Sequence, residues 1–169
     1  MKTADEIIAH LNLKPHPNEG GFYVETYRSS GTIPNNALGR FYSGERSFGT
    51  AIYYLLTPAT FSAIHQLPGD EIFHFYLGDP VEMLQLKPSG EGETVLLGTD
   101  FARRMRPQVV VPGGVWQGSR LLPGGRFALL GTTMAPGFDF SDYTTGLRAD
   151  LIAQYPNFEE EIVALTRES

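Results

Sequence analysis

The sequence contains no cysteine. This absence excludes disulfide bonds, thiolate metal ligands and a cysteine nucleophile. It also agrees with a reducing compartment, and we expect the protein in the cytoplasm. The first residues lack a basic stretch followed by an apolar one, so no secretory signal peptide is expected. No apolar run approaches the roughly 18 residues that a membrane-spanning helix needs, so we expect no membrane partner.

Positive charge is scarce. Thirteen lysines and arginines face 19 aspartates and glutamates, which gives a net charge of −6. Because an acidic surface repels polyanions, we expect no nucleic-acid partner. The glycine motifs that bind phosphate or dinucleotides are also absent, and so is the Gly-x-Ser-x-Gly motif of a nucleophile elbow.

Glycine and proline, in contrast, are plentiful, with 19 and 12 residues. Together with an aromatic content of 12%, they indicate many short strands separated by turns. Nine segments have the composition of strands, and proline and glycine stand between most of them. The predicted strands are Phe22–Arg28, Thr50–Leu56, Phe61–His65, Glu71–Leu77, Val81–Leu86, Thr94–Leu97, Val109–Val111, Val115–Ser119 and Phe127–Thr133.

Short helices are predicted at both ends. Thr3 and Glu6 have the spacing of a capping box at the start of the first helix. Near the C-terminus, Leu147–Gln154 is a second candidate, and Asn157 can cap a third helix. We therefore expect a single all-β domain over residues 1–169, a sandwich or barrel with short N- and C-terminal helices.

Two polar residues, His65 and Glu71, flank a Pro-Gly turn between otherwise apolar strands. Charged groups in buried strands are costly unless they are paired or used. A histidine beside a carboxylate can act as a general base, because the carboxylate fixes the tautomer and raises the pKa of the imidazole. A structural alternative is that Glu71 pairs with an arginine inside the barrel, such as Arg28, and that His65 has no chemical role.

The spacing of these residues resembles the two motifs of cupins. Glu71 and Gly78 match the E-x6-G part of the first motif, and His65 matches its second histidine, with five intervening residues rather than three or four. Pro112 and Gly114 match the PxG of the second motif. Further segments resemble the uncharacterised cupin-five family, and these are His16–Tyr23, Thr50–Leu56, Asp70–Phe75 and Pro136–Phe140. The order of segments resembles that of cupins over roughly residues 20 to 135, and the resemblance implies an RmlC-like jelly-roll barrel, that is, a double-stranded β-helix.

The sequence departs from the family's metal-binding pattern. Cupins that bind metal commonly use three histidines and a glutamate, but Ala63 and Gln117 stand at the first and last histidine positions. A catalytic divalent site normally needs at least three good ligands. We therefore expect no metal cofactor. If a divalent metal does bind, its ligands are expected to be His65, Glu71 and Gln117.

The resemblance implies one interior pocket centred on His65, Glu71 and Gln117. Side chains alternate between the two faces of a strand, so residues at even spacing from these three share their face. The predicted ligand-binding residues are Gln117, Phe61, Phe73, Phe75, Ser119 and Arg28. Aromatic walls suit a small, flat or partly apolar molecule. Odd spacing from Glu71 directs His74 away from the interior, and we expect His10 and His16 at the surface.

Two functions fit these observations. The first is a cupin that binds a small molecule and has no established catalysis. The alternative is a metal-free isomerase or epimerase that acts on a small sugar-type metabolite, with His65 as general base and Glu71 orienting it. The resemblance permits this alternative, because metal-free cupins related to sugar-nucleotide epimerases use a histidine base. We also expect a homodimer, because cupins often pair through an edge strand that would otherwise be exposed.

Overall fold

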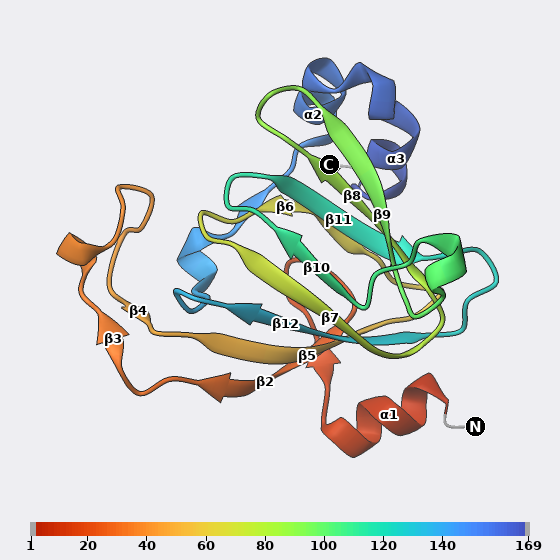
Figure 1. The fold of residues 1–169 in the computed structure, drawn as a ribbon, viewed down its shortest axis with the longest axis horizontal. Helices are drawn as coiled ribbons and strands as arrows, with labels where there is room; N and C mark the ends of the chain where they lie inside the picture. The colour runs from red at the N-terminus through yellow and green to blue at the C-terminus, as the bar shows by residue number, and fades with distance from the viewer. Residues whose placement is uncertain (1–2, 168–169) are drawn as a thin grey trace.

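The computed structural model describes residues 3–167 and consists mainly of antiparallel strands in two facing sheets (Figure 1). The six-stranded sheet has the order β1-β2-β5-β12-β7-β10, and the five-stranded sheet has the order β13-β6-β11-β8-β9. The strands of the two sheets are β1 (Lys14–Pro15), β2 (Phe22–Arg28), β5 (Thr50–Leu56), β6 (Ser62–Gln66), β7 (Glu71–Gly78), β8 (Val81–Leu86), β9 (Gly92–Leu97), β10 (Gln108–Val111), β11 (Trp116–Leu121), β12 (Ala128–Met134) and β13 (Thr144–Thr145). The expected jelly-roll barrel with short terminal helices is confirmed.

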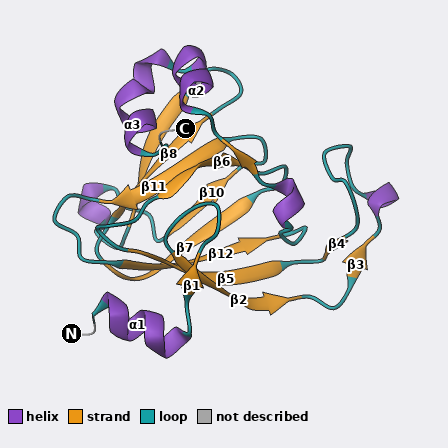
Figure 2. Ribbon diagram, turned by 180° about the vertical axis from the view of Figure 1, so that it is seen from behind, coloured by secondary structure: helices purple, strands orange, loops and turns teal. Residues whose placement is uncertain are grey.

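Helices and short 3-10 turns connect and cover the sheets. They are α1 (Ala4–Leu11), η1 (Asn35–Ala37), η2 (Phe101–Arg103), η3 (Phe140–Asp142), α2 (Arg148–Gln154), η4 (Pro156–Phe158) and α3 (Glu159–Ala164). A small hairpin of β3 (Thr32–Ile33) and β4 (Arg46–Ser47) extends away from the two larger sheets (Figure 2). The sequence did not predict these two-residue strands, because so short a segment has no detectable alternation.

The main core lies between the two sheets. Its buried side chains come from alternate positions of facing strands, as the period of two requires. They include Tyr54 and Leu56 on β5, Phe73 on β7, and Met83 on β8. This apolar filling occupies much of the barrel interior and limits the space that is left for a ligand.

The outer face of the six-stranded sheet is covered by α1. The helix begins with the predicted capping box, in which the Glu6 amide donates to Thr3 Oγ1 and the Thr3 amide donates to the Glu6 carboxylate. Ile7 and Leu13 then pack with Leu55, Phe127 and Leu129 of the sheet region. The apolar side of the helix thus explains why this sheet is apolar on both faces.

The outer face of the five-stranded sheet is covered by α2 and α3. Leu151 and Tyr155 of this region pack on Ile64 and Leu84 of the sheet. The prediction that Asn157 caps the last helix is wrong, because Asn157 lies inside η4 and no side chain caps α3. Pro156 explains the difference, since it stands at the first position of a 3-10 turn that leads into the helix.

The two motif glycines occupy turns that other residues adopt only with strain. Gly78 has φ of 107° and lies against the carbonyl oxygen of Phe127, so a side chain there would collide with backbone. Gly114 has φ of 80° in the turn before β11. A nearby pair of hydrogen bonds fixes the same end of the barrel: Gln66 Nε2 donates to the Gly114 carbonyl at 2.6 Å, and the Gly113 amide donates to Asp70 Oδ1 at 2.8 Å.

Candidate functional site

A cavity of about 420 Å³ lies at one end of the barrel, next to the main core. Strands β2, β5, β6, β7 and β12 supply one part of its wall, and residues 138–143 supply another. Tyr23, Phe138, Phe140 and Tyr143 are its aromatic members. The volume falls in the range of about 300 to 1,000 Å³ that is typical of small-molecule sites.

Glu71 and Gln117 are joined by a buried hydrogen bond beside the cavity. Gln117 Nε2 donates to Glu71 Oε2 at 2.7 Å, and both residues are buried. The pKa of Glu71 is raised, first because burial disfavours the carboxylate and second because the Glu19 carboxylate is near. The other amide atom of Gln117, Oε1, is buried without a hydrogen-bond partner among the described residues. Glu71 lines the cavity, whereas Gln117 stands behind it and orients it.

His65 also lines the cavity, and its ring is stacked on that of Tyr143, with centroids 4.8 Å apart. Its Nδ1 lies 2.8 Å from the carbonyl oxygen of Ala63. The sequence predicted that Glu71 would orient this imidazole and raise its pKa. Instead the Ala63 carbonyl orients the ring, and the pKa of His65 is lowered because burial disfavours the charged form more than Glu71 favours it.

A second histidine, His16, enters the same cavity, so the prediction that it lies at the surface is wrong. It is 8% exposed and accepts a hydrogen bond at Nδ1 from the Glu19 amide, at 2.9 Å. Glu19 is buried as well, and Ser62 Oγ donates a short hydrogen bond to its Oε1. Burial lowers the pKa of His16 and raises that of Glu19. Two buried histidines and two buried carboxyl groups therefore line one cavity.

The sequence contained a signal for this second pair. His16–Tyr23 is one of the segments that carry the resemblance to the cupin-five family, but proline-rich connections usually lie at the surface. The structure shows that the segment between β1 and β2 turns inward instead, and the Ala63 amide donates to the Glu19 carbonyl at 2.8 Å. This long-range contact has no local pattern that could predict it.

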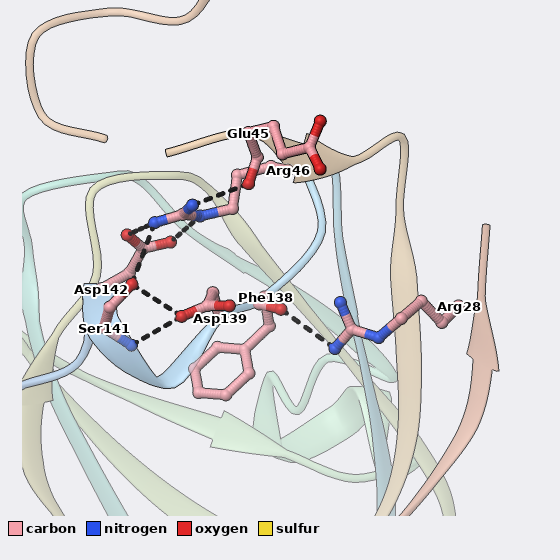
Figure 3. A network of polar contacts seen from close by, with 7 residues as sticks. All are labelled: Arg28, Glu45, Arg46, Phe138, Asp139, Ser141 and Asp142. Carbon is pink, nitrogen blue, oxygen red and sulfur yellow. Dashed lines mark hydrogen bonds and ion pairs between the residues drawn. The ribbon is translucent and has the colours of Figure 1, made fainter. Parts of the chain in front are cut away.

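The wall formed by residues 138–143 is held by a polar network (Figure 3). Arg46 of β4 makes a two-pronged ion pair with Asp142, with Nε–Oδ2 at 2.7 Å and Nη2–Oδ1 at 2.5 Å. Both side chains are almost fully buried, at 4% and 5% exposed. Arg28 donates to the Phe138 carbonyl at 3.1 Å, and Ser141 donates to Asp139 at 2.6 Å. The network joins the β3–β4 hairpin to the cavity wall.

Arg28 lines the cavity but does not pair with Glu71, so the structural alternative for Glu71 is not supported. Its guanidinium instead binds both oxygens of Glu25, at 2.9 and 2.7 Å. The hydrogen bond from Arg28 to the Phe138 carbonyl adds to this arrangement. Arg28 therefore belongs to the half-exposed rim of the cavity. Its charge is paired with Glu25 and not with the buried carboxyl groups.

The other predicted lining residues lie outside the cavity wall. Phe73 is part of the main core, and Phe75 packs against that core. Phe61 precedes β6 rather than beginning it, and its ring packs with the cluster under α2 and α3. Ser119 is fully buried on β11, and its Oγ has no partner among residues 3–167. The pairing of β11 with β6 shifts register between Gln117 and Ser119, which separates their environments.

His74 points to the outer face of the six-stranded sheet, as its odd spacing from Glu71 predicts. Its Nε2 lies 3.2 Å from Thr133 Oγ1, and its ring is stacked with that of Tyr76. Thr133 is on the neighbouring strand β12 and Tyr76 is on β7 itself, and neither residue lines the cavity. His74 is therefore a suitable control for substitutions of the cavity histidines.

The donor set of the cavity does not fit a divalent metal. Within residues 3–167, no three histidine, aspartate or glutamate side chains come together in an arrangement that could hold one. The amide nitrogen of Gln117 faces Glu71, so the amide does not direct an oxygen to a cation beside that carboxylate.

We predict that Glu71→Gln stabilises the protein more near neutral pH than near pH 4.5, which is the ordinary pKa of a glutamate side chain. The pKa of Glu71 is higher in the folded protein than in the unfolded chain. As the pH rises from 4.5 toward the folded-state pKa, Glu71 therefore ionises in the unfolded chain first, and this ionisation lowers the free energy of unfolding. Glutamine cannot ionise but still accepts the hydrogen bond from Gln117. Urea unfolding at the two pH values measures the difference, with the exposed Glu91→Gln as the matched control. An equal change at both pH values would contradict the prediction.

The chain matches the family model described as Cupin superfamily (DUF985), Cupin_5, over residues 5–146. It is 34% identical over 150 residues to the uncharacterised protein YML079W of Saccharomyces cerevisiae, with 84% of this chain and 74% of that protein covered. No helix among the described residues is long and apolar enough to cross a membrane.

Solved structures are also similar to this chain. Protein SO0799 from Shewanella oneidensis is 34% identical, with a TM-score of 0.88 and full coverage of both chains. A hypothetical protein from Leishmania major is 31% identical, with a TM-score of 0.88 and coverage of 99% and 100%. At 14% identity, a dTDP sugar isomerase from Desulfovibrio desulfuricans shares the fold alone, with a TM-score of 0.52 and coverage of 74% and 83%. The chain thus belongs to the cupin superfamily, in the family Cupin_5 (DUF985).

Proposed function

We propose that this cupin binds a small, partly apolar organic molecule in the cavity beside His65 and Glu71. The observation that carries the proposal is the composition of the cavity wall. Buried imidazole and carboxyl groups lie next to aromatic rings in a space of about 420 Å³. Such a mixture binds the apolar body of a ligand and orients it through a few polar groups.

The proposal is tested on untagged protein by native mass spectrometry and by a thermal-shift screen of small metabolites. We expect either a retained small molecule or a set of binding compounds, and we expect His65→Gln to weaken binding by about tenfold or more. His74→Gln, on the outer face, is the matched control and should leave the affinity unchanged. Equal affinities for the two variants would count against the site.

A metal-free isomerase or epimerase is the second candidate, and the orientation of His65 favours it. Because a carbonyl oxygen only accepts, Nδ1 of His65 must carry the proton that is shared with Ala63. The lowered pKa keeps the ring neutral near pH 7, so Nε2 carries a lone pair that can remove a proton from a substrate. The distant structural likeness to a dTDP sugar isomerase agrees with this candidate.

Incubating the retained or screened ligand with the protein in deuterium oxide separates the two candidates. Proton abstraction by His65 would replace one carbon-bound hydrogen of the ligand by deuterium, and His65→Gln would stop that exchange. A ligand that binds without any exchange identifies a binding protein. The same native mass spectra also measure the assembly, for which we propose a homodimer, and we propose the cytoplasm as the compartment.

A further inference from the structure

The two histidines of the cavity use the same ring atom in opposite ways. At His65, Nδ1 faces a backbone carbonyl oxygen, which accepts hydrogen bonds and cannot donate them. Nδ1 therefore carries the proton and Nε2 carries the lone pair. At His16, Nδ1 faces the backbone N–H of Glu19 at 2.9 Å, which donates and cannot accept. Here Nδ1 carries the lone pair, and Nε2 carries the proton of the neutral ring.

The Nε2 atom of each ring makes no hydrogen bond within residues 3–167. His16 Nε2 is 3.7 Å from Glu19 Oε2, which is beyond hydrogen-bond distance. No hydrogen bond to His65 Nε2 occurs within residues 3–167. Both side chains line the cavity. The cavity wall thus carries one nitrogen acceptor, at His65, and one N–H donor, at His16.

The neighbouring carboxyl groups do not remove this difference. One Glu19 oxygen accepts from Ser62 Oγ, and one Glu71 oxygen accepts from Gln117 Nε2. Both side chains are buried, and their pKa values are raised. The charged or titratable groups that act on His16 are Glu19, His65 and Arg167. The one that acts on His65 is Glu71. Burial outweighs the carboxyl groups and lowers the pKa of both imidazoles.

We propose that the cavity holds two neutral imidazoles in opposite tautomers, and that it thereby selects a neutral ligand that donates one hydrogen bond to His65 Nε2 and accepts one from His16 Nε2. The proposal rests on the proposed function and adds His16 as the specificity-determining residue. The ligand class comprises flat molecules that carry both a donor and an acceptor, such as a lactam or an enolised hydroxycarbonyl compound. The aromatic wall then covers the faces of the ligand.

The tautomers are measured directly by nitrogen-15 NMR of the histidine side chains near neutral pH, because protonated and unprotonated ring nitrogens resonate far apart. The variants His16→Gln and His65→Gln assign the two signals, while His10 and His74 serve as histidines outside the cavity. We expect an Nε2–H ring at His16 and an Nδ1–H ring at His65. Identical tautomers, or a charged ring at either position, would overturn the proposal without any reference to a ligand.

Three related probes then test the ligand class in the same NMR experiment. 2-Pyridone presents an N–H beside a carbonyl, 3-methyl-2-pyridone adds a methyl group and keeps the N–H, and N-methyl-2-pyridone loses it. We expect the first two to shift the nitrogen signals of both cavity histidines and to bind about tenfold or more tightly than the third. Equal or absent binding of all three overturns the ligand class. Failure of the proposed function shows separately, as the absence of any ligand in the mass spectra and the thermal-shift screen.

Discussion

Asp142→Ala is expected to lower the free energy of unfolding by about 3 to 5 kcal/mol, because it leaves the Arg46 guanidinium buried without its counter-ion. Arg46 is 5% exposed, and two of its nitrogens bind the two carboxylate oxygens of Asp142. The remaining hydrogen-bond partners of Arg46, Ser141 Oγ and the Glu45 carbonyl, carry no charge. Guanidinium chloride unfolding of the full chain measures the loss.

Two comparisons show whether burial of the charge is the cause. Glu93→Ala removes the half-exposed partner of Lys87, and we expect a loss of only about 0 to 1 kcal/mol. The double variant Arg46→Met with Asp142→Leu removes both buried charges and should recover most of the stability that Asp142→Ala loses. A loss for Asp142→Ala no greater than that for Glu93→Ala would contradict the prediction.

Phe73→Ala is expected to lower the free energy of unfolding by about 3 to 5 kcal/mol and to leave ligand affinity unchanged in the protein that remains folded. Phe73 is 2% exposed and lies in the main core between the sheets, not in the cavity wall. Its removal creates a void that the antiparallel strands on either side of β7 cannot close fully. Unfolding curves and binding isotherms at a temperature well below the midpoint measure the two quantities separately.

The exposed Phe101→Ala is the matched control for this prediction. Phe101 is 72% exposed in a 3-10 turn, so we expect a change within about 0.5 kcal/mol. If Phe73→Ala instead weakened ligand binding by about tenfold or more with a small effect on stability, Phe73 would belong to the pocket, as the alternation of β7 first predicted.

Much of the fold could be predicted because its signals are local. Turn glycines and prolines divide the chain at almost the observed strand ends, and the bounds of β2, β5 and β8 agree with the prediction. The capping box at Thr3 also formed as expected. Asn157 does not cap α3, because it lies inside the 3-10 turn η4, where the backbone is already helical.

The site could be predicted only in part, because its members come from distant segments. The motif spacing identified His65 and Glu71, which both line the cavity. It could not identify His16, Glu19 or Tyr143, whose places depend on how the chain folds back over the barrel end. Alternation also does not reveal where an interior filled by apolar side chains gives way to an open space, and for this reason Phe73 and Phe75 were assigned to the pocket.

The strand order of the six-stranded sheet has a consequence for synthesis of the chain. Strand β12, residues 128–134, lies between β5 and β7, and the cavity wall needs residues 138–143. During translation, therefore, β5 and β7 leave the ribosome long before the strand that joins them, with unpaired edges exposed to the solvent. Nascent chains can gain little help from a ligand, because the binding site is complete only after most of the polypeptide has emerged. The distant pairings also favour slow folding, which prolongs the exposure of these edges.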